Sequence, residues 1–474
     1  MAVTTNLEAD YVIAGSGAVG MAFADIILTE SDATVIIVDK YAKPGGHWNV
    51  AYPFVTLHQP ASYYGVSSSE LSGGRIEQGG LNAGLAELSS GAAVSAYFDD
   101  VMRHQFLPTG RVQYFPLHNY EGSGNFVSNI TGEQLRASAT LRTVDATYLK
   151  TSVPSTHTPN FTIDNDVRFM ALNDLPTIDL PADGYVVIGA GKTGIDACLW
   201  LLEHGVEPDT ITWVVSRDAW LLDRKNTQMG AEFFFDTLGA QAAMMESIVA
   251  AESPEDMFHR LEEVGYFVRI DESAEPEMFH GATVSRLEVE ALRQITNVVR
   301  LGHVTAIHAD QIELVEGAIS TTPNTIHVDC SASAISNLET KPIFADTLIT
   351  PQLVRPYQPV FSAAFIAHVE LTYETEEEKN ALCGVVAFPN TLDDFVRFTA
   401  AALVNQYAWS QDRALQRWIG GNRLDGASEL IRSMTKDDTD KREVLNRIRH
   451  NAPAAAVKLF EFQTAIDAEE AQHG

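Results

Sequence analysis

Residues 182–202 read ADGYVVIGAGKTGIDACLWLL, and residues 9–28, ADYVIAGSGAVGMAFADIIL, carry the same pattern earlier in the chain. Each copy begins with a short apolar run that is typical of a buried parallel strand. Three glycines at the G-x-G-x-x-G spacing and a helix-like apolar stretch come next. One such motif alone is weak, because an ordinary glycine turn gives the same letters. With strand and helix in place both times, the sequence predicts two dinucleotide-binding units.

The glycines and their neighbours are expected to hold the phosphates of each dinucleotide. The first glycine allows a tight turn, the second lets a pyrophosphate approach the backbone, and the third lets the helix pack on its strand. The pyrophosphate then lies at a helix N-terminus, where free N–H groups and the helix dipole favour an anion. The expected binding residues are Gly15, Gly17 and Gly20 in the first copy, and Gly189, Gly191, Lys192, Thr193 and Gly194 in the second.

The strand that comes after each motif ends differently and so indicates a different nucleotide. The first ends at Asp39, whose carboxylate is placed to accept hydrogen bonds from a ribose diol. The second ends at Ser216 and Arg217, where the arginine would pair with a 2′-phosphate and no carboxylate repels it. We therefore expect FAD in the first unit and NADPH in the second. The alternative is that Arg217 is a solvated surface residue beside Asp218.

Composition indicates a folded protein of a reducing compartment. The chain has 474 residues, 45% of them hydrophobic and 20% charged, which suits two or three domains. Its net charge of −31 argues against binding to nucleic acid or anionic membranes, since both depend on clustered lysine and arginine. The three cysteines are far apart, with no C-x-x-C, and the first residues resemble neither a signal peptide nor a spanning helix. We expect a cytoplasmic protein.

The segment KYAKPGGHWN, residues 40–49, comes directly after the first acidic residue and forms a glycine turn that ends in an aromatic side chain. We count Lys40, Gly46 and Trp48 among the cofactor-binding residues. Gly46 lets the chain pass close to a bound group. Trp48 either packs on a ring system or anchors the loop in a core, and the chemistry of the residue alone leaves both open.

Several short motifs resemble flavin-dependent monooxygenases of the two-dinucleotide-domain type, which include flavin-containing, Baeyer–Villiger and plant auxin-forming monooxygenases. They are Gly-Gly-His-Trp at 45–48, Tyr-Pro at 52–53, Leu-His-Gln-Pro at 57–60 and Tyr-Tyr at 63–64. The run VVSRDAWLLDR, residues 214–224, is similar to the family's segment after the NADPH strand. This resemblance puts Arg217 at the 2′-phosphate, with Arg224 as a helper.

The resemblance implies an α/β fold with two Rossmann-like dinucleotide-binding domains, for FAD and NADPH, the second inserted in the first. The expected parts are the start of the FAD domain at 1–180, the NAD(P) domain at 181–328, and the completion of the FAD domain with C-terminal helices at 329–474. Short alternating strands between 111 and 153 predict an antiparallel meander, and residues 228–300 predict a helical insertion that walls the substrate cavity. The charged tail after Asp437 is expected on the surface.

The activity that the resemblance implies is insertion of one oxygen atom from O2 into a small organic substrate, via a flavin peroxide, by an NADPH-dependent FAD monooxygenase. His58 and Gln59 are the candidate catalytic residues, as hydrogen-bond donors beside the flavin. The alternative is a loop histidine and glutamine satisfied by the backbone. Residues 167–184 lack the phenylalanine, glycine and histidine signature that these enzymes carry. An FAD oxidoreductase that passes NAD(P)H electrons to another acceptor, or a nucleotide sensor without turnover, therefore stays open.

Overall fold

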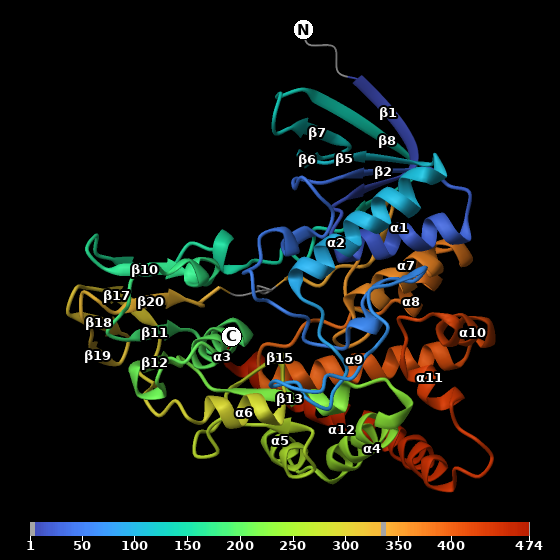
Figure 1. Cartoon of the computed structure of the whole chain (residues 1–474). Helices are drawn as coiled ribbons and strands as arrows, with labels where there is room; N and C mark the ends of the chain where they lie inside the picture. Colours follow the sequence, from blue (N-terminus) through green and yellow to red (C-terminus); the bar gives the residue numbers. More distant parts are fainter. Residues whose placement is uncertain (1–4, 333–337, 474) are drawn as a thin grey trace.

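Two Rossmann-like units and a group of C-terminal helices make up the computed structural model, which describes residues 5–332 and 338–473 (Figure 1). The strands of the first sheet are β1 (Thr5–Ala14), β2 (Val35–Val38), β5 (Val112–Phe115), β8 (Gln134–Asp145), β21 (Phe344–Ala345) and β22 (Leu348–Ile349). Their order is β21-β22-β8-β1-β2-β5, and all neighbours except β21 and β22 run parallel. Because β22 joins this sheet after residue 338, the chain leaves the first unit and later returns to it.

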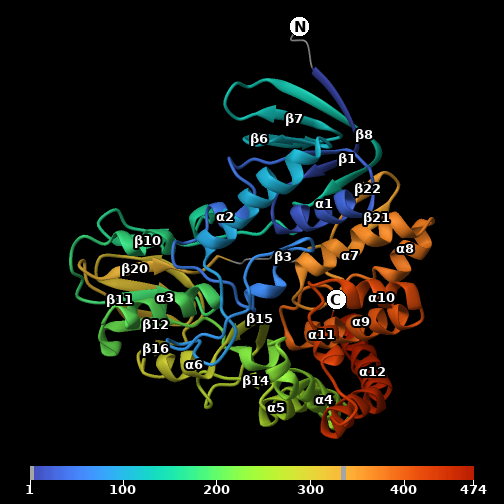
Figure 2. The same ribbon diagram turned by 45° about the vertical axis from the view of Figure 1, so that its right-hand side comes forward.

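The helix after the first glycine motif lies in the interior of the first unit. This helix, α1 (Ala18–Glu30), is apolar on every side, and its residues from Gly20 to Leu28 are all buried. A helix of this kind needs cover on all faces. The first sheet covers one face and α7 (Pro359–Thr372) covers another, so that α1 and α7 lie side by side in Figures 1 and 2.

The second unit is a five-stranded, fully parallel sheet of order β10-β20-β11-β12-β16. Its strands are β10 (Arg168–Ala171), β11 (Tyr185–Ile188), β12 (Ile211–Val214), β16 (Val298–Val299) and β20 (Ile326–Asp329), and α3 (Lys192–Glu203) comes after the second glycine motif. A small sheet of β9 (Thr162–Ile163), β17 (Val304–Ile307), β18 (Gln311–Leu314) and β19 (Gly317–Ser320) packs beside it. The α/β fold with two Rossmann-like units, predicted from the glycine motifs, is confirmed.

The meander expected between residues 111 and 153 is confirmed in part. The strands β6 (His118–Gly122), β7 (Asn125–Ser128) and β8 pair antiparallel in sequence order and belong to the same first sheet. The strand β5 does not join this meander but pairs parallel with β2, and the long β8 also pairs parallel with β1. Alternation in sequence indicates strands, but their partners depend on which apolar faces meet in space. The long β8 therefore pairs with β1 rather than only with its neighbours in sequence.

The insertion after residue 228 is only partly helical, which corrects the expectation. Its helices are α4 (Phe234–Ala250), α5 (Pro254–Glu263) and α6 (Arg286–Leu292). They surround a three-stranded sheet of β13 (Ala219–Asp223), β14 (Phe267–Val268) and β15 (Met278–Val284). The last of these helices ends at Leu292, and the chain then enters β16 of the second sheet. A short apolar strand between helices has too few residues to show its period in sequence.

The C-terminal helices pack beneath the first unit and against the insertion, at the lower right of Figure 1. They are α7, α8 (Glu376–Leu382), α9 (Leu392–Ser410), α10 (Arg413–Gly421), α11 (Ala427–Arg432) and α12 (Thr439–His473). The charged tail expected on the surface is in fact α12, which packs on α4 and α9. Its Leu459 and Phe462 are buried among the aromatic residues of the insertion.

The remaining regular elements are short and mostly precede the second unit. They are the helix α2 (Gly91–Val101) with its continuation η3 (Met102–Phe106), the strands β3 (Gly65–Val66) and β4 (Ser69–Glu70), and the single turns η1 (Gly46–Asn49), η2 (Ala61–Tyr63), η4 (Leu107–Thr109), η5 (Pro154–Thr156), η6 (Leu172–Thr177), η7 (Pro208–Thr210), η8 (Arg224–Thr227) and η9 (Ala231–Phe233). In the described part of the chain, no helix combines the length and apolarity that crossing a membrane requires.

We predict that Gly20→Ala destabilises the first unit and abolishes flavin uptake. A Cβ at position 20 would overlap the carbonyl oxygen of Gly15, so α1 would have to move away from β1. Overpacking of this kind costs about 2 to 3 kcal/mol. Thermal unfolding and flavin content measure the effect, with Gly79→Ala as control because no atom lies within 4 Å of a Cβ there. Equal melting temperatures for the two variants would contradict the close packing.

Candidate active site

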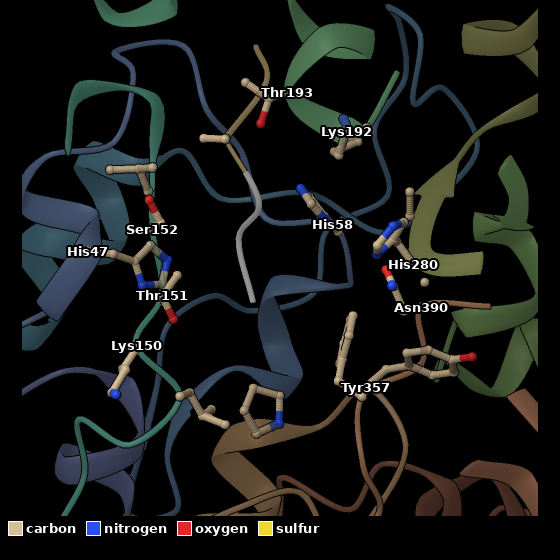
Figure 3. A pocket seen from close by; sticks show the side chains of 18 of the residues that line it. His47, His58, Lys150, Thr151, Ser152, Lys192, Thr193, His280, Tyr357 and Asn390 are labelled. Atoms are coloured by element: carbon tan, nitrogen blue, oxygen red, sulfur yellow. The ribbon is translucent and has the colours of Figure 1, made fainter. Parts of the chain in front are cut away.

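A cavity of about 1980 Å³ lies between the two Rossmann units, the insertion and the C-terminal helices. Both glycine loops line it, as do the segment from Gly46 to Pro60 and the linker from Ala146 to Pro154. It is therefore the one described space onto which both nucleotide motifs open. Figure 3 shows its side chains converging from several elements that are far apart in sequence.

The first glycine loop packs directly on the backbone of the segment after β2. Gly15 has φ +99°, a left-handed conformation that favours glycine. A Cβ on Gly46 would lie 2.9 Å from the Cα of Gly17, so these two glycines pack backbone to backbone. Gly45 donates its N–H to the carbonyl of Ser16 at 2.8 Å. The segment after β2 is thus fastened directly to the loop.

Asp39 ends β2 and faces the same loop. Its carboxylate is 5% exposed and accepts hydrogen bonds from the Ser16 N–H at 2.6 Å, the Ser16 hydroxyl at 2.8 Å and the Tyr41 N–H at 2.8 Å. A carboxylate offers about four acceptor positions, so one remains for a ribose hydroxyl. Lys40 beside it is exposed at the cavity edge, with its Nζ 5.0 Å from the centre of the Tyr41 ring.

The second glycine loop repeats the geometry of the first. Gly189 has φ +128° and lies against the carbonyl of Cys330, which is the first residue after β20. A Cβ on Gly194 would overlap the carbonyl oxygen of Gly189, so α3 begins directly against β11. Gly191, by contrast, has no atom within 4 Å of its Cβ position and opens on the cavity.

The N-termini of the two glycine-loop helices show whether these sites fit a dinucleotide. Six other helices, α2, α5, α6, α8, α9 and α10, have a Ser, Thr or Asp whose side chain caps the first N–H groups. The helices α4, α7 and α11 lack such a cap. The helices α1 and α3 also lack one, begin at Gly17 and Gly191 of the two strand–glycine–helix motifs, and have no acidic residue in the first turn. These N-termini have the free donors and open backbone that a pyrophosphate needs, so the residues fit.

Ser216 and Arg217 come after β12 and line the cavity. Within the described residues, the Arg217 guanidinium is exposed and has no hydrogen-bond or ion-pair partner. Asp218 beside it is bound by Arg300 at 2.7 and 3.0 Å. The arginine thus stays available to an anion at the cavity mouth.

Arg224 does not occupy the position that the resemblance implied. It is 0% exposed, donates to both carboxylate oxygens of Glu288 at 2.7 and 3.0 Å, and also donates to Asn82 and to the carbonyl of Thr283. Breaking such a buried pair is costly, so this side chain is not free to reach a phosphate. We therefore correct its role to that of a structural arginine that joins β13, β15 and α6.

The segment that resembles the monooxygenase motifs runs along one wall of the cavity. The Trp48 Nε1 donates to the Tyr64 hydroxyl at 2.9 Å, so the indole is anchored in the loop while it also lines the cavity. His47 and His58 point into the cavity in Figure 3. Burial lowers the pKa of His47 to about 4, and burial together with the charge of Lys192 lowers the pKa of His58 to about 3. Both imidazoles are neutral near pH 7.

His58 and Gln59 have no hydrogen-bond partner within the part of the chain that the structure describes. The alternative that backbone groups satisfy them is therefore not what the geometry shows. Both side chains line the cavity and are available to a bound group. Their role in a reaction stays a prediction.

Several cavity residues were missed by the sequence analysis. His280 lies in β15, where the pairing with β13 is interrupted by a bulge, and Gly281 there has φ +66°. The Tyr357 ring packs on Gly281, and Tyr357 itself has φ +58°, which is unusual for a residue with a side chain. Bulges and strained residues gather at functional sites. The only available signals were a lone glycine in an apolar run and the two prolines near Tyr357, Pro356 and Pro359.

The described residues hold no cluster of side chains with metal-ligand geometry, and their three cysteines are buried thiols. Burial raises the pKa of Cys198 and of Cys330 well above its usual range. Such thiols are poor nucleophiles.

The chain is similar to several solved structures at low identity. One is closed cyclohexanone monooxygenase, with 12% identity and a TM-score of 0.48, where the match covers 93% of this chain and 98% of that chain. Another is oxidized steroid monooxygenase bound to NADP, with 12% identity and a TM-score of 0.48, where the match covers 76% of this chain and 84% of that chain. A third is the bacillithiol disulfide reductase from Staphylococcus aureus, with 11% identity and a TM-score of 0.44, where the match covers 78% of this chain and 100% of that chain. Flavin-dependent monooxygenases are the class that the glycine, tryptophan and histidine motifs resemble.

No family model matches the sequence. Over 463 residues it is 42% identical to the uncharacterized protein Rv2000 of Mycobacterium tuberculosis, with 98% of this chain and 86% of that protein covered. An uncharacterized protein of Mycobacterium bovis matches to the same extent. The chain belongs to the same family as these mycobacterial proteins.

Proposed function

We propose that the protein is an NADPH-dependent FAD monooxygenase that acts on a small organic substrate. The observation that carries the proposal is the pair of uncapped helix N-termini, at Gly17 and Gly191, that open on one cavity. Two dinucleotides held there have their phosphates on opposite sides of a shared space. FAD, when bound, supplies hydride acceptance from NADPH and activation of O2.

The residues of the chain bind and orient the two cofactors in this proposal. Gly15, Gly17 and Gly46 leave the backbone open to the FAD pyrophosphate, and Asp39 offers its free acceptor position to the ribose. Gly189, Gly191, Lys192 and Thr193 receive the NADPH pyrophosphate, and Ser216 and Arg217 receive the 2′-phosphate. Gly20 and Gly194 let the two helices start close to their strands. A guanidinium and a phosphate form charge-assisted, often bidentate hydrogen bonds, which favours NADPH over NADH.

His58 and Gln59 are proposed to act on the reacting side of the cavity. A neutral imidazole and a carboxamide each offer a donor and an acceptor without a charge. Because burial and Lys192 lower the pKa of His58 to about 3, its imidazole does not titrate between pH 5 and 8. The pair therefore presents the same uncharged hydrogen-bonding groups over this pH range.

The substrate is proposed to occupy the part of the cavity next to the insertion. Aromatic and thioether side chains line it there, namely Tyr63, Met229, Tyr357 and Phe388, together with the polar His280 and Asn390. In Figure 3, His58, His280 and Asn390 all extend into the cavity. The N–H of Phe279, next to His280, donates to the carbonyl of Asn390 at 3.4 Å. Burial, and then the nearby Arg217, lower the pKa of His280, so it is also neutral. An uncharged organic molecule with one hydrogen-bonding group fits these walls.

The second candidate is an FAD oxidoreductase that passes electrons to another acceptor. It is favoured by residues 167–184, which form β10 and η6 and lack the histidine-bearing signature of the monooxygenases. The two candidates differ in the fate of the reduced flavin. Reduced protein is mixed with O2 in the presence of NADP+, and absorbance is monitored through the flavin bands. A transient species distinct from oxidised and reduced flavin supports the monooxygenase, whereas direct return to oxidised flavin supports the second candidate.

We predict that the purified protein is yellow and holds FAD without a covalent bond, since backbone groups and one carboxylate form its site. Gly17→Val should abolish flavin binding, because the new side chain would fill the space of the pyrophosphate and press on Gly46. Flavin absorbance after gel filtration measures the bound fraction. The matched control is Gly73→Val, at a glycine with open space around it. Full flavin content in Gly17→Val would refute the assignment of this loop.

His58→Ala and Gln59→Ala should keep FAD bound and release hydrogen peroxide faster once the reduced flavin meets O2. Each substitution removes a hydrogen-bonding group from the cavity wall and admits water. The measurement is the yield of hydrogen peroxide per NADPH consumed, taken from pH 5 to 8. The difference in yield between His58→Ala and the parent protein should be the same at every pH in this range. Gln78→Ala, in an exposed turn, is the control. Parental peroxide yields in both cavity variants would make these residues structural.

Arg217→Ala should raise the Michaelis constant for NADPH and leave that for NADH nearly unchanged. Losing a charge-assisted contact with the 2′-phosphate costs about 1.5 to 3 kcal/mol, or roughly 10- to 150-fold. Steady-state kinetics with both nucleotides provide the measurement. Arg75→Ala serves as control, since Arg75 is a highly exposed arginine that pairs with Glu87. Small and equal effects on both nucleotides would place the 2′-phosphate elsewhere.

A further inference from the structure

One face of α3 carries four functional groups at a spacing of four residues. They are Lys192, Asp196, Trp200 and His204, the last at the C-cap of the helix. Residues four apart lie above one another on a helix surface, so the four side chains form a continuous stripe. Lys192 and Asp196 form a close ion pair, and the rings of Trp200 and His204 stack with centroids 3.8 Å apart.

The stripe is covered by residues 50–54, which belong to the first unit. The Tyr52 hydroxyl donates to the Asp196 carboxylate at 2.5 Å. The Phe54 ring stacks on Trp200 with centroids 5.4 Å apart and an interplanar angle of 28°. One short segment of the flavin unit thus contacts both the polar and the aromatic half of the stripe on the second unit.

The backbone of residues 50–54 is also held by hydrogen bonds from residues outside α3. The carbonyl of Val50 accepts from the Ser155 hydroxyl at 2.6 Å and from the Asn173 carboxamide at 3.0 Å. Tyr52 is itself only 6% exposed. Its position relative to α3 is therefore set by several contacts and does not depend on the Asp196 hydrogen bond alone.

The positive charge of Lys192 is electrostatically unfavourable at the N-terminus of α3 and is stabilised by a bound anion. Lys192 is the first residue of α3, at the positive end of the helix dipole, where a cation is typically destabilising. Its side chain is 10% exposed, and within the described residues Asp196 is the only partner of its ammonium group. The lysine lies on the cavity wall beside the open Gly191, as Figure 3 shows for Lys192. An ammonium group has three donors, so it can keep Asp196 and still bind a phosphate oxygen.

We propose that Tyr52 and Asp196 are positioning residues that hold the Lys192 ammonium in place for the pyrophosphate of the nicotinamide dinucleotide. The proposal rests on the proposed function, since it takes that dinucleotide to bind at the second glycine loop. Tyr52 fixes the Asp196 carboxylate, and the carboxylate in turn fixes the lysine. Burial, and then the charge of Asp196, raise the pKa of Tyr52 well above its usual range, so the phenol stays a donor at all working pH values.

The arrangement links the two cofactor sites through one stretch of chain. Tyr52 lies between Gly46, which packs on the first glycine loop, and His58, which lines the cavity beyond. A nicotinamide dinucleotide that binds Lys192 is therefore connected, through Asp196 and Tyr52, to the segment that lines the flavin site.

The test is equilibrium binding of NADP+ and NAD+ to FAD-loaded Tyr52→Phe, measured by calorimetry without turnover. We expect both dissociation constants to rise about tenfold, as for one lost hydrogen bond to a charged group, with flavin content unchanged. Equal loss for both nucleotides places the effect at the pyrophosphate, whereas a 2′-phosphate contact would affect NADP+ alone. The matched control is Tyr373→Phe, whose hydroxyl donates to Asp412 at 2.7 Å away from the cavity.

Lys192→Met provides the second variant, and Tyr52→Phe combined with it completes a double-mutant cycle. If Tyr52 acts through Lys192, the double variant binds no more weakly than Lys192→Met alone. Unchanged dissociation constants in Tyr52→Phe, or fully additive losses in the double variant, would overturn the proposal. Failure of the parent protein to bind either nucleotide would instead overturn the proposed function on which it rests.

Discussion

The close contact of each glycine-loop helix with its own strand is the constraint on which the rest of the structure depends. Gly20 and Gly194 leave no room for a side chain between helix and loop. Each helix therefore begins where its strand ends, with its first N–H groups directed at the space beyond the sheet. Since both units obey this rule and face each other, one cavity receives two sets of unpaired donors. A substitution at either glycine would change the direction of a helix as well as its local packing.

Some basic side chains of the protein form ion pairs that stabilise the fold, and others remain available to a ligand. Arg224 is fully buried against Glu288, and Arg300 is bound by Asp218 and Asp271. Arg217, in contrast, has no partner among the described residues, and Lys192 is paired only within its own helix. In a chain with a net charge of −31, a free guanidinium on a cavity wall is a specific attraction for phosphate.

The sequence was sufficient for the parts of the fold that depend on local rules. Strand, glycine turn and helix are encoded within about twenty residues, and so both glycine loops were predicted at the positions where the structure has them. Arg224 was misplaced because nothing in a linear motif shows that Glu288, far along the chain, will be its partner. His280 and Tyr357 were missed because a bulge and a left-handed tyrosine arise from packing between distant segments. The parallel pairing of β5 with β2 and of β8 with β1, and the packing of one face of α12 on α4 and α9, have the same origin, since partners far along the chain decide them.

The central claim is that nicotinamide and flavin meet in the shared cavity, and anaerobic reduction tests it most directly. FAD-loaded protein is mixed in a stopped-flow instrument with NADPH and with NADPH deuterated at either face of C4. Hydride transfer within the cavity predicts saturable bleaching of the flavin, slowed by a primary isotope effect for one face only. Absence of reduction, or reduction that neither saturates nor shows an isotope effect for either face, would contradict the account.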